Sequence, residues 1–393
     1  MSADSVVIVG SGLAGYNVAR ELRKLDAQVP IVVISRDHAG FYSKPMLSNA
    51  LAGKKTAATL VMKAADKIGA EINARVLPHS TVERLDTQAR TLLLNNGEVL
   101  PYRDVVLALG ADPIRLPLQG NAADSVLSVN DLDDFARFAE ALDHPAGDGV
   151  KHVTILGAGL IGCEFANDLL HRGIEPTVLD LADRALGRLL PEAASLRLQT
   201  QLEAAGARFR FGVAVKSVDL GPEGVGLQVT LTDGSTMKTD LVLSAIGLRP
   251  RTALAASAGL QINRGVVVDR HLATSAPHVY ALGDCAEVDG HTLPFVLPLM
   301  QQARALAAGL AGQRTPVAYP AMPVVVKTPA CPTVVCPPPL DAQGEWTITT
   351  TEDGLEARFT ASGNPEQLLG FALQGKAVSQ RQALAALIPP LWI

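Results

Sequence analysis

The sequence predicts an α/β protein with two doubly wound, three-layer domains built on parallel sheets, followed by a small α+β domain. Three observations carry this prediction. The same strand–glycine–helix pattern occurs twice, beginning at Val6 and at Val153. Further apolar strand patterns follow each copy, as expected for sheets built from successive βα units. From about Pro323 the chain changes to a proline-rich stretch and alternating strand patterns, which indicates a separate unit.

Length and composition fit this architecture. The chain has 393 residues, enough for two or three domains with their own cores. Its hydrophobic content of 48% and net charge of −5 are typical of a globular protein and argue against bulk binding to nucleic acid or anionic membranes. No apolar run approaches the ~20 residues that cross a bilayer. The first residues lack the pattern of an export signal, so we expect a cytoplasmic protein.

Both copies of the repeat have the form of a Rossmann-like dinucleotide-binding unit, because a buried strand leads through G-x-G-x-x-G into a helical pattern. The first glycine permits the tight turn, the second lets a pyrophosphate approach the backbone, and the third lets the helix pack on the strand. The helix N-terminus adds free N–H groups and a positive dipole end. We therefore expect two bound dinucleotides, at Gly10, Gly12 and Gly15 and at Gly157, Gly159 and Gly162.

The residue that ends the second strand of each unit is expected to hold the adenosine ribose. In the second copy this residue is Asp180, whose carboxylate would accept hydrogen bonds from the ribose hydroxyls and repel a 2′-phosphate. This favours NAD over NADP, although Arg184 nearby keeps NADPH possible. In the first copy no acid stands at the expected place, and either Asp37 or Ser35 could take the role.

Five motifs in a fixed order resemble those of a known family. They are GSGLAG at 10–15, LALG at 107–110, GAGLIGCE at 157–164, SAIGLRP at 244–250 and YALGDCAE at 280–287. The order is similar to that of the flavoproteins with two dinucleotide-binding domains, which include the ferredoxin, putidaredoxin and rubredoxin reductases. The resemblance covers almost the whole chain. The stretches 42–48 and 322–329 look most similar to the NADH:rubredoxin reductases of alkane-degrading bacteria.

The resemblance implies a domain organisation and a reaction. It implies an FAD-binding domain from residues 1–112 and 246–322, an NAD-binding domain from 113–245, and a small α+β domain from 323–393. NADH would give hydride to bound FAD, and single electrons would pass to the iron of a rubredoxin, within an alkane-hydroxylation or oxidative-stress chain. A [2Fe–2S] ferredoxin or a flavorubredoxin remains an alternative acceptor. An NADH oxidase is a weaker alternative, and a flavin-bound NADH sensor would belong to another class.

The resemblance also implies which residues surround the flavin. Lys44 and Glu164 would form the catalytic pair beside the isoalloxazine, with Glu164 meeting the nicotinamide carboxamide. Lys327 is a second candidate for the flavin edge, with a snorkelling lysine as the alternative. Asp284 would accept a hydrogen bond from a ribityl hydroxyl.

A helix that begins at Pro298 would point its N-terminus at the flavin, although a packing helix would look the same. The other FAD contacts that the resemblance implies are Leu13, Ala14, Ser35, Asp37, Pro45, Val82, Ala108, Gly110 and Gly283, and the other NAD contacts are Leu160, Ile161 and Gly247.

The cysteines separate this chain from the disulfide reductases of related architecture. The stretch 37–55, where a redox cysteine pair or a single peroxidase-type cysteine would be expected, contains none. The spacing of Cys331 and Cys336 fits neither a metal site nor a CxxC motif, and Cys163 and Cys285 stand inside nucleotide motifs. We expect all four to be structural and no metal to be bound. Without a thiol relay the flavin itself must pass electrons on, which suits a one-electron metalloprotein acceptor.

Overall fold

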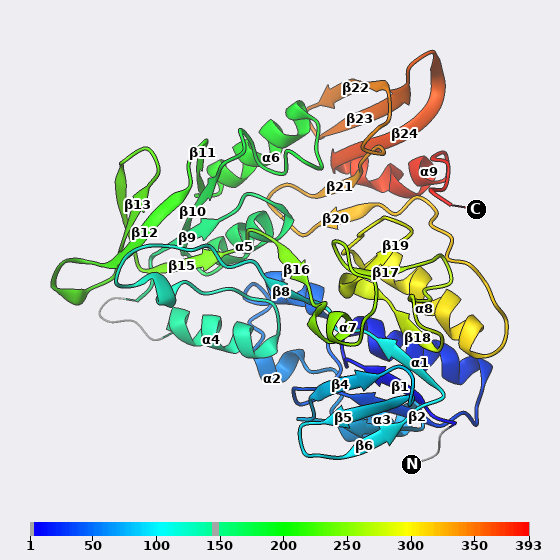
Figure 1. The fold of residues 1–393 in the computed structure, drawn as a ribbon. Coiled ribbons are helices and arrows are strands. Elements are labelled where there is room, and N and C mark those ends of the chain that lie inside the picture. The colour runs from blue at the N-terminus through cyan, green and yellow to red at the C-terminus, as the bar shows by residue number, and fades with distance from the viewer. Residues whose placement is uncertain (1–3, 144–148, 393) are drawn as a thin grey trace.

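The computed structural model describes residues 4–143 and 149–392. Figure 1 shows the first unit, for which FAD is expected (the FAD unit), at the bottom and right, and the second unit, for which NAD is expected (the NAD unit), at the left. The antiparallel sheet of the third unit lies at the top right. Within the described residues, no helix is both long and apolar enough to cross a bilayer.

The first unit is built on a five-stranded parallel sheet with the order β18-β7-β1-β2-β3. Its strands are β1 (Val6–Val9), β2 (Ile31–Ile34), β3 (Ala74–Leu77), β7 (Asp104–Leu107) and β18 (Val279–Ala281). The central strand β1 pairs on both sides, with Val7 opposite Val32 and Val105. Every residue of β1, β2 and β7 is buried, in keeping with their apolar sequences, in which Asp104 at the start of β7 is the exception.

Two further layers complete the first unit. Helices α1 (Leu13–Leu25) and α8 (Val296–Leu310) pack against each other and against the sheet. An antiparallel meander, β4 (Val82–Asp86), β5 (Thr91–Leu94) and β6 (Val99–Pro101), adds its apolar side chains to the same core. The chain thus buries the sheet between helices and a layer of strands.

The second unit repeats this plan. Its parallel sheet has the order β11-β10-β9-β15, formed by β9 (His152–Leu156), β10 (Glu175–Asp180), β11 (Arg208–Phe211) and β15 (Leu241–Ser244). The helices are α4 (Leu132–Asp143), α5 (Leu160–Leu170) and α6 (Glu192–Ala204), and the meander is β12 (Val215–Leu220), β13 (Leu227–Leu231) and β14 (Thr236–Thr239). The sequence repeat is therefore a repeat of whole supersecondary units.

Two short strands connect these units. β8 (Ala111–Pro113) leaves the first unit and β16 (Leu248–Pro250) returns to it, and the two pair antiparallel. After β16 the chain rejoins the first sheet through β18. We propose that the boundaries expected at 112/113 and 245/246 lie at this two-strand link.

The third unit is an antiparallel sheet with the order β20-β21-β24-β23-β22. Its strands are β20 (Val324–Val326), β21 (Thr333–Cys336), β22 (Gly344–Thr351), β23 (Gly354–Ala361) and β24 (Asn364–Gly375). The hairpin turn predicted at Asp353-Gly354 lies one residue earlier, because Gly354 already belongs to β23. The helix predicted over 379–387 is shorter, with η5 (Lys376–Gln380) leading into α9 (Arg381–Ala385).

The remaining elements are short and lie in connections. They are η1 (Lys44–Asn49), α2 (Ala57–Leu60), α3 (Ala65–Glu71), η2 (Ala123–Ser125), η3 (Pro222–Gly224), α7 (Ala253–Ser257), β17 (Val266–Val268), η4 (Gly283–Cys285) and β19 (Ala286–Val288). The predicted α/β class, with two Rossmann-like units and a small C-terminal α+β unit, is confirmed.

Candidate active site

The first and third glycines of both loops have no room for a side chain. A Cβ at Gly15 would meet the carbonyl oxygen of Gly10 at 1.9 Å, and one at Gly162 would meet that of Gly157 at 1.9 Å. Gly10 and Gly157 also adopt positive φ angles of +121° and +102°. The strand, turn and helix can pack this closely only because these positions are glycine.

The second glycine of each loop faces open space instead. A Cβ at Gly12 or Gly159 would find no atom within 4 Å. These two residues are the N-caps of α1 and α5, and neither helix receives a side-chain capping bond. Each loop thus presents free backbone N–H groups at a positive helix end with room above the second glycine. This geometry fits the pyrophosphate of one dinucleotide at each loop.

Both candidate residues at the end of β2 lie together beside the first loop. The Ser35 hydroxyl donates to Oδ1 of Asp37 at 2.6 Å and lies 2.6 Å from the hydroxyl of Ser11, which stands inside the glycine motif. The N–H of Ala39 also donates to Asp37, at 2.8 Å. Burial acts to raise the pKa of Asp37, but the bonds from Ser35 and Ala39 outweigh it, and the pKa is lowered. Which of the two holds the ribose stays a prediction.

The acid of the second unit binds its loop directly. Asp180 is the last residue of β10, and its Oδ2 accepts the N–H of Ala158 in the glycine motif at 2.6 Å. Its Oδ1 accepts the N–H of Ala182 at 2.8 Å. Arg184, the residue that could favour NADPH, forms an ion pair with Asp183 at 2.9 Å. The position of Asp180 at the loop is the one expected of a ribose-binding acid, and that role stays a prediction.

The motif at 283–284 meets the first turn of α1. Gly283 has a φ of +74°, and a Cβ there would lie 2.9 Å from the side chain of Ala14. Oδ2 of Asp284 lies 3.8 Å from Nζ of Lys44 in η1. Burial lowers the pKa of Lys44, and the carboxylate of Asp284 partly offsets this effect.

Glu164 is fully buried and is surrounded by groups from all three units. Oε2 accepts the hydroxyl of Ser48 at 2.5 Å and forms an ion pair with Nζ of Lys327, while Oε1 accepts the backbone N–H of Lys327 at 3.0 Å. The expected direct pair of Lys44 with Glu164 is therefore wrong. Lys44 pairs with Asp284, whereas Glu164 receives the cation of Lys327 from the third unit.

The other predicted contacts are placed at the loops or at strand ends. Leu13 and Ala14 lie in the first turn of α1, Leu160 and Ile161 in that of α5, Pro45 in η1, Val82 at the start of β4, Ala108 and Gly110 just after β7, and Gly247, at a φ of +117°, between β15 and β16. The helix predicted to begin at Pro298 begins at Val296, with Pro298 buried in its first turn. The roles of these residues stay predictions.

Asp168 was not predicted and belongs to the same junction. It lies one turn after Glu164 on α5, is buried, and accepts the N–H groups of Leu51 at 2.9 Å and Ala52 at 2.8 Å. Burial raises the pKa of Asp168 above its ordinary value. Two acids at i and i+4 in a mostly apolar helix were the available sequence signal, since buried carboxylates require partners.

The cysteines lie in the packed interior. Cys163, Cys285, Cys331 and Cys336 are free and buried. Burial raises the pKa of the Cys163 thiol to about 12 and that of the Cys285 thiol to about 11, so both stay protonated near neutrality. Among residues 4–143 and 149–392, no cluster of three or more His, Cys, Asp or Glu side chains could hold a metal ion.

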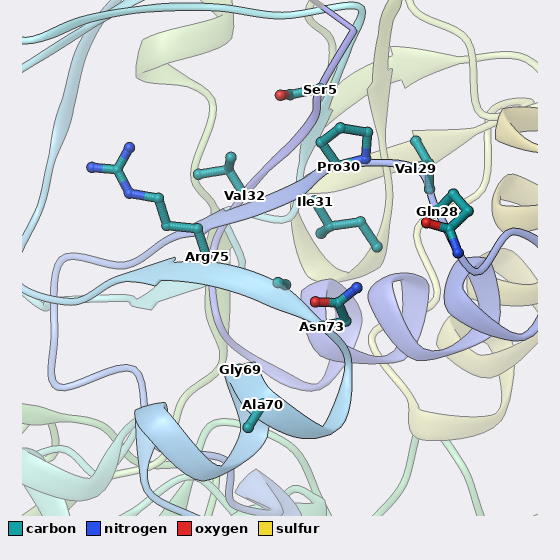
Figure 2. Close-up of a pocket in the computed structure, with 11 residues that line it drawn as sticks. Ser5, Gln28, Val29, Pro30, Ile31, Val32, Gly69, Ala70, Asn73 and Arg75 are labelled. Atoms are coloured by element: carbon teal, nitrogen blue, oxygen red, sulfur yellow. The ribbon is translucent and has the colours of Figure 1, made fainter. Parts of the chain in front are cut away.

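Two cavities lie outside the nucleotide loops. Figure 2 shows one of about 580 Å³, lined by Ser5, by Ile31 and Val32 at the start of β2 and by Arg75 of β3. It lies at the amino ends of the strands, whereas ligands of open α/β sheets bind at the carboxyl ends. A second cavity of about 340 Å³ lies at the junction of the three units, between Asp168 and Lys327.

Two glycine loops that fit dinucleotides, joined by a buried junction of charged residues, define an oxidoreductase that couples a flavin to a pyridine nucleotide. The family comparison is more specific. The chain belongs to the pyridine nucleotide-disulphide oxidoreductase family, whose model matches residues 4–309, and residues 316–388 match the rubredoxin-binding C-terminal domain. Members of this group use FAD and NADH.

Similar proteins agree over nearly the full length. A rubredoxin-NAD(+) reductase of Alcanivorax borkumensis is 47% identical over 98% of this chain and 99% of its own. Another of Acinetobacter baylyi is 45% identical over 98% of each chain. A nitric oxide reductase FlRd-NAD(+) reductase of Aeromonas hydrophila is 38% identical over 98% of this chain and 96% of its own.

Solved structures share the three-unit arrangement. The ferredoxin reductase of the CYP199A2 system from Rhodopseudomonas palustris superimposes with a TM-score of 0.87 at 29% identity, over 98% of this chain and 95% of its own. The reductase in a covalent putidaredoxin reductase–putidaredoxin complex also gives 0.87, at 27% identity over 99% and 94%.

Proposed function

We propose that this protein transfers electrons from NADH through bound FAD to a rubredoxin. One observation carries the proposal. Lys327, from the unit that matches the rubredoxin-binding domain, forms an ion pair with Glu164 on α5 of the NAD unit. Ser48 of the FAD unit bonds the same carboxylate. The acceptor-binding unit therefore contacts the residue at which both nucleotide units converge.

Each unit has a defined task in this proposal. The loop at Gly12 holds FAD, with Asp284 facing the ribityl hydroxyls and Lys44 near the ring. The loop at Gly159 holds NADH, with Asp180 at the ribose and Glu164 at the carboxamide. The bound flavin accepts a hydride and can return electrons one at a time. Glu164, fixed by three hydrogen-bond and ionic contacts, orients the nicotinamide without a thiol relay.

Anaerobic steady-state turnover tests this proposal. Purified holoprotein is supplied with NADH or NADPH and with rubredoxin or a [2Fe–2S] ferredoxin as the acceptor. We expect rapid rubredoxin reduction and a clear preference for NADH, because Asp180 repels a 2′-phosphate. Faster reduction of the ferredoxin would contradict the acceptor, and equal use of NADPH would contradict the role of Asp180.

A flavorubredoxin is the second candidate acceptor. Relatives named nitric oxide reductase FlRd-NAD(+) reductases are 36% and 38% identical to this chain, compared with 45% and 47% for the rubredoxin-NAD(+) reductases. We expect kcat/KM to be higher for a free rubredoxin than for a flavorubredoxin in the same assay. We also propose a cytoplasmic location, which the four free cysteines support.

A further inference from the structure

The segment 389–392 folds back from the third unit onto the FAD unit. The N–H of Leu391 donates to the carbonyl of Tyr319 at 2.8 Å, and Trp392 forms an antiparallel bridge with Tyr319. The C label in Figure 1 lies on the side where the connection from α8 to β20 runs. This connection contains Tyr319, so the segment 389–392 contacts a defined stretch of the chain between α8 and β20.

The indole of Trp392 sits in an aromatic and cationic site. Its ring stacks on Tyr319, with centroids 4.8 Å apart and an interplanar angle of 22°. His291 meets it edge-on at 5.2 Å, and the guanidinium of Arg270 lies 5.3 Å from the ring centroid. Stacked and cation–π contacts of this kind stabilise the position of the indole.

Tyr319 connects this site to the interior. It is fully buried, and its hydroxyl oxygen accepts the amide N–H of Gln302 at 2.7 Å. Gln302, buried in α8, uses its carbonyl oxygen to accept the N–H of Gly283 at 2.7 Å. A continuous path therefore runs from the indole through two buried polar groups to the backbone of Gly283.

The backbone of Gly283, at the end of this path, is tightly constrained by its surroundings. It has a φ of +74°, and its Cα lies so close to Ala14 of the first glycine helix that an added Cβ would come within 2.9 Å. The next residue, Asp284, pairs with Lys44. A small shift of this turn would move Asp284 and the contact with α1 together.

We propose that Trp392 is a positioning residue for FAD, which acts through Tyr319 and Gln302 to hold the turn at Gly283. Stacking of the indole holds Tyr319 in the orientation in which its hydroxyl oxygen accepts the amide N–H of Gln302. The carbonyl oxygen of Gln302 then accepts the N–H of Gly283 and holds it in place. The inference rests on the proposed binding of FAD at the first loop. It assigns to the 389–392 segment a role in retaining the flavin.

The test is the rate at which the holoprotein loses FAD. Holoprotein is diluted, and the rise of free-flavin fluorescence is followed with time. Trp392→Ala is expected to release FAD about tenfold faster, since tenfold corresponds to about 1.4 kcal/mol, the scale of one aromatic contact. Trp392→Phe keeps a stacking ring and is expected to restore most of the retention.

The other tryptophan of the chain gives a matched control. Trp346 of β22 is also partly exposed and packs against one ring, Phe359, at 5.4 Å. Trp346→Ala makes the same change in the third unit, and we expect FAD release within twofold of the unsubstituted protein. Release that is equally fast in Trp346→Ala and Trp392→Ala would overturn the proposal.

Tyr319→Phe separates the path from general destabilisation. It keeps the stack with Trp392 and removes only the hydroxyl that Gln302 reaches, so it is expected to accelerate FAD release as well. Because both residues act along one path, the double variant with Trp392→Ala should release FAD no faster than the faster single variant. Additive effects would contradict the path.

This readout is independent of the acceptor. If the unsubstituted protein retains FAD but does not reduce rubredoxin, the proposed function fails and the role of Trp392 stands. If rubredoxin is reduced normally and Trp392→Ala retains FAD as well as the unsubstituted protein, the role of Trp392 fails and the proposed function stands.

Discussion

The two glycine loops share one backbone geometry and differ in what closes them. In both loops, a Cβ added at the third glycine would lie 1.9 Å from the carbonyl oxygen of the first glycine, and the second glycine faces open space. In the NAD unit the carboxylate of Asp180 bonds the loop backbone itself at Ala158. In the FAD unit Asp37 reaches the loop through the hydroxyls of Ser11 and Ser35.

The glycine motif alone does not distinguish two tasks, which are to bind a pyrophosphate and to select the dinucleotide, and the comparison of the two loops separates them. The glycine geometry that fits a pyrophosphate is the same in both units. The groups around the loop then decide which dinucleotide binds and how firmly. The FAD loop is closed from a second side by Gly283, whereas the NAD loop ends at an acid that accepts backbone N–H groups of its own unit.

The largest effect is expected when a lysine that pairs with a carboxylate at the junction is replaced, and the two pairs are Lys327 with Glu164 and Lys44 with Asp284. Glu164 of the NAD unit is fully buried, whereas Asp284 of the FAD unit is partly exposed. Lys327→Met would leave a buried carboxylate without its cation and lower the free energy of unfolding by about 3 kcal/mol. Lys44→Met, the matched change, should cost about 1 kcal/mol or less, because its partner keeps access to water. Denaturant unfolding of both variants decides this, and equal losses would contradict the contrast.

The glycines provide the next test. Gly15→Ala and Gly162→Ala place a Cβ at 1.9 Å from a backbone oxygen, and each should lower the free energy of unfolding by about 1–3 kcal/mol. Gly12→Ala and Gly159→Ala fill only open space and should leave folding nearly unchanged. We expect the first of these to lose FAD and the second to raise KM for NADH while the flavin stays bound. Flavin content after gel filtration and steady-state KM measure both, and a shared loss of FAD would contradict separate loops.

Asp180 tests the nucleotide preference. Asp180→Ser removes the charge that faces the ribose, so kcat/KM for NADH should fall about 10–100-fold, the scale of a hydrogen bond to a charged group. Use of NADPH should rise, because the repulsion of a 2′-phosphate is gone. Ser35→Ala in the other loop is the control and should leave the NADH to NADPH ratio unchanged. An unaltered ratio in Asp180→Ser would overturn the role of this acid.

Asp37 gives the smallest effect, seen at acid pH. Its pKa is lowered in the folded protein from an ordinary value of 3.8. Below that value the unfolded chain binds a proton before the folded protein does, so the stability that Asp37 contributes is present above pH 3.8 and is lost as the pH falls through the lowered pKa. Asp37→Asn should therefore flatten the acid limb of a stability–pH curve in that window. An identical acid limb in the variant would contradict the contribution.

The repeated scaffold could be predicted because its signals are local. A buried parallel strand needs a run of apolar residues, and the turn after it needs glycines at fixed spacing, so Val6–Gly15 and Val153–Gly162 indicate the same unit. The three last strands of the third unit, β22, β23 and β24, alternate and are bounded by turn residues, so their positions could also be predicted. Strand β21 could not, because it lies inside the proline-rich stretch.

The junction could not be predicted, since it depends on how the units pack. Nothing in the sequence around Lys327 indicates that it reaches Glu164, which lies on helix α5 of another unit. The expected pairing of Lys44 with Glu164 also depended on packing, and Lys44 instead pairs with Asp284, from the returning part of the FAD unit. The path from Trp392 to Gly283 was missed for the same reason, because each of its contacts joins residues that are distant in the chain.

An anaerobic titration tests the central claim, one resident flavin and one exchangeable nicotinamide, most directly. Holoprotein is titrated with NADH while the flavin absorbance is followed, and oxidised rubredoxin is then added. The account predicts one FAD per chain, full bleaching by one equivalent of NADH, and recovery of the oxidised flavin by two equivalents of rubredoxin, since each takes one electron. Two flavins per chain, or a flavin that NADH does not bleach, would contradict it.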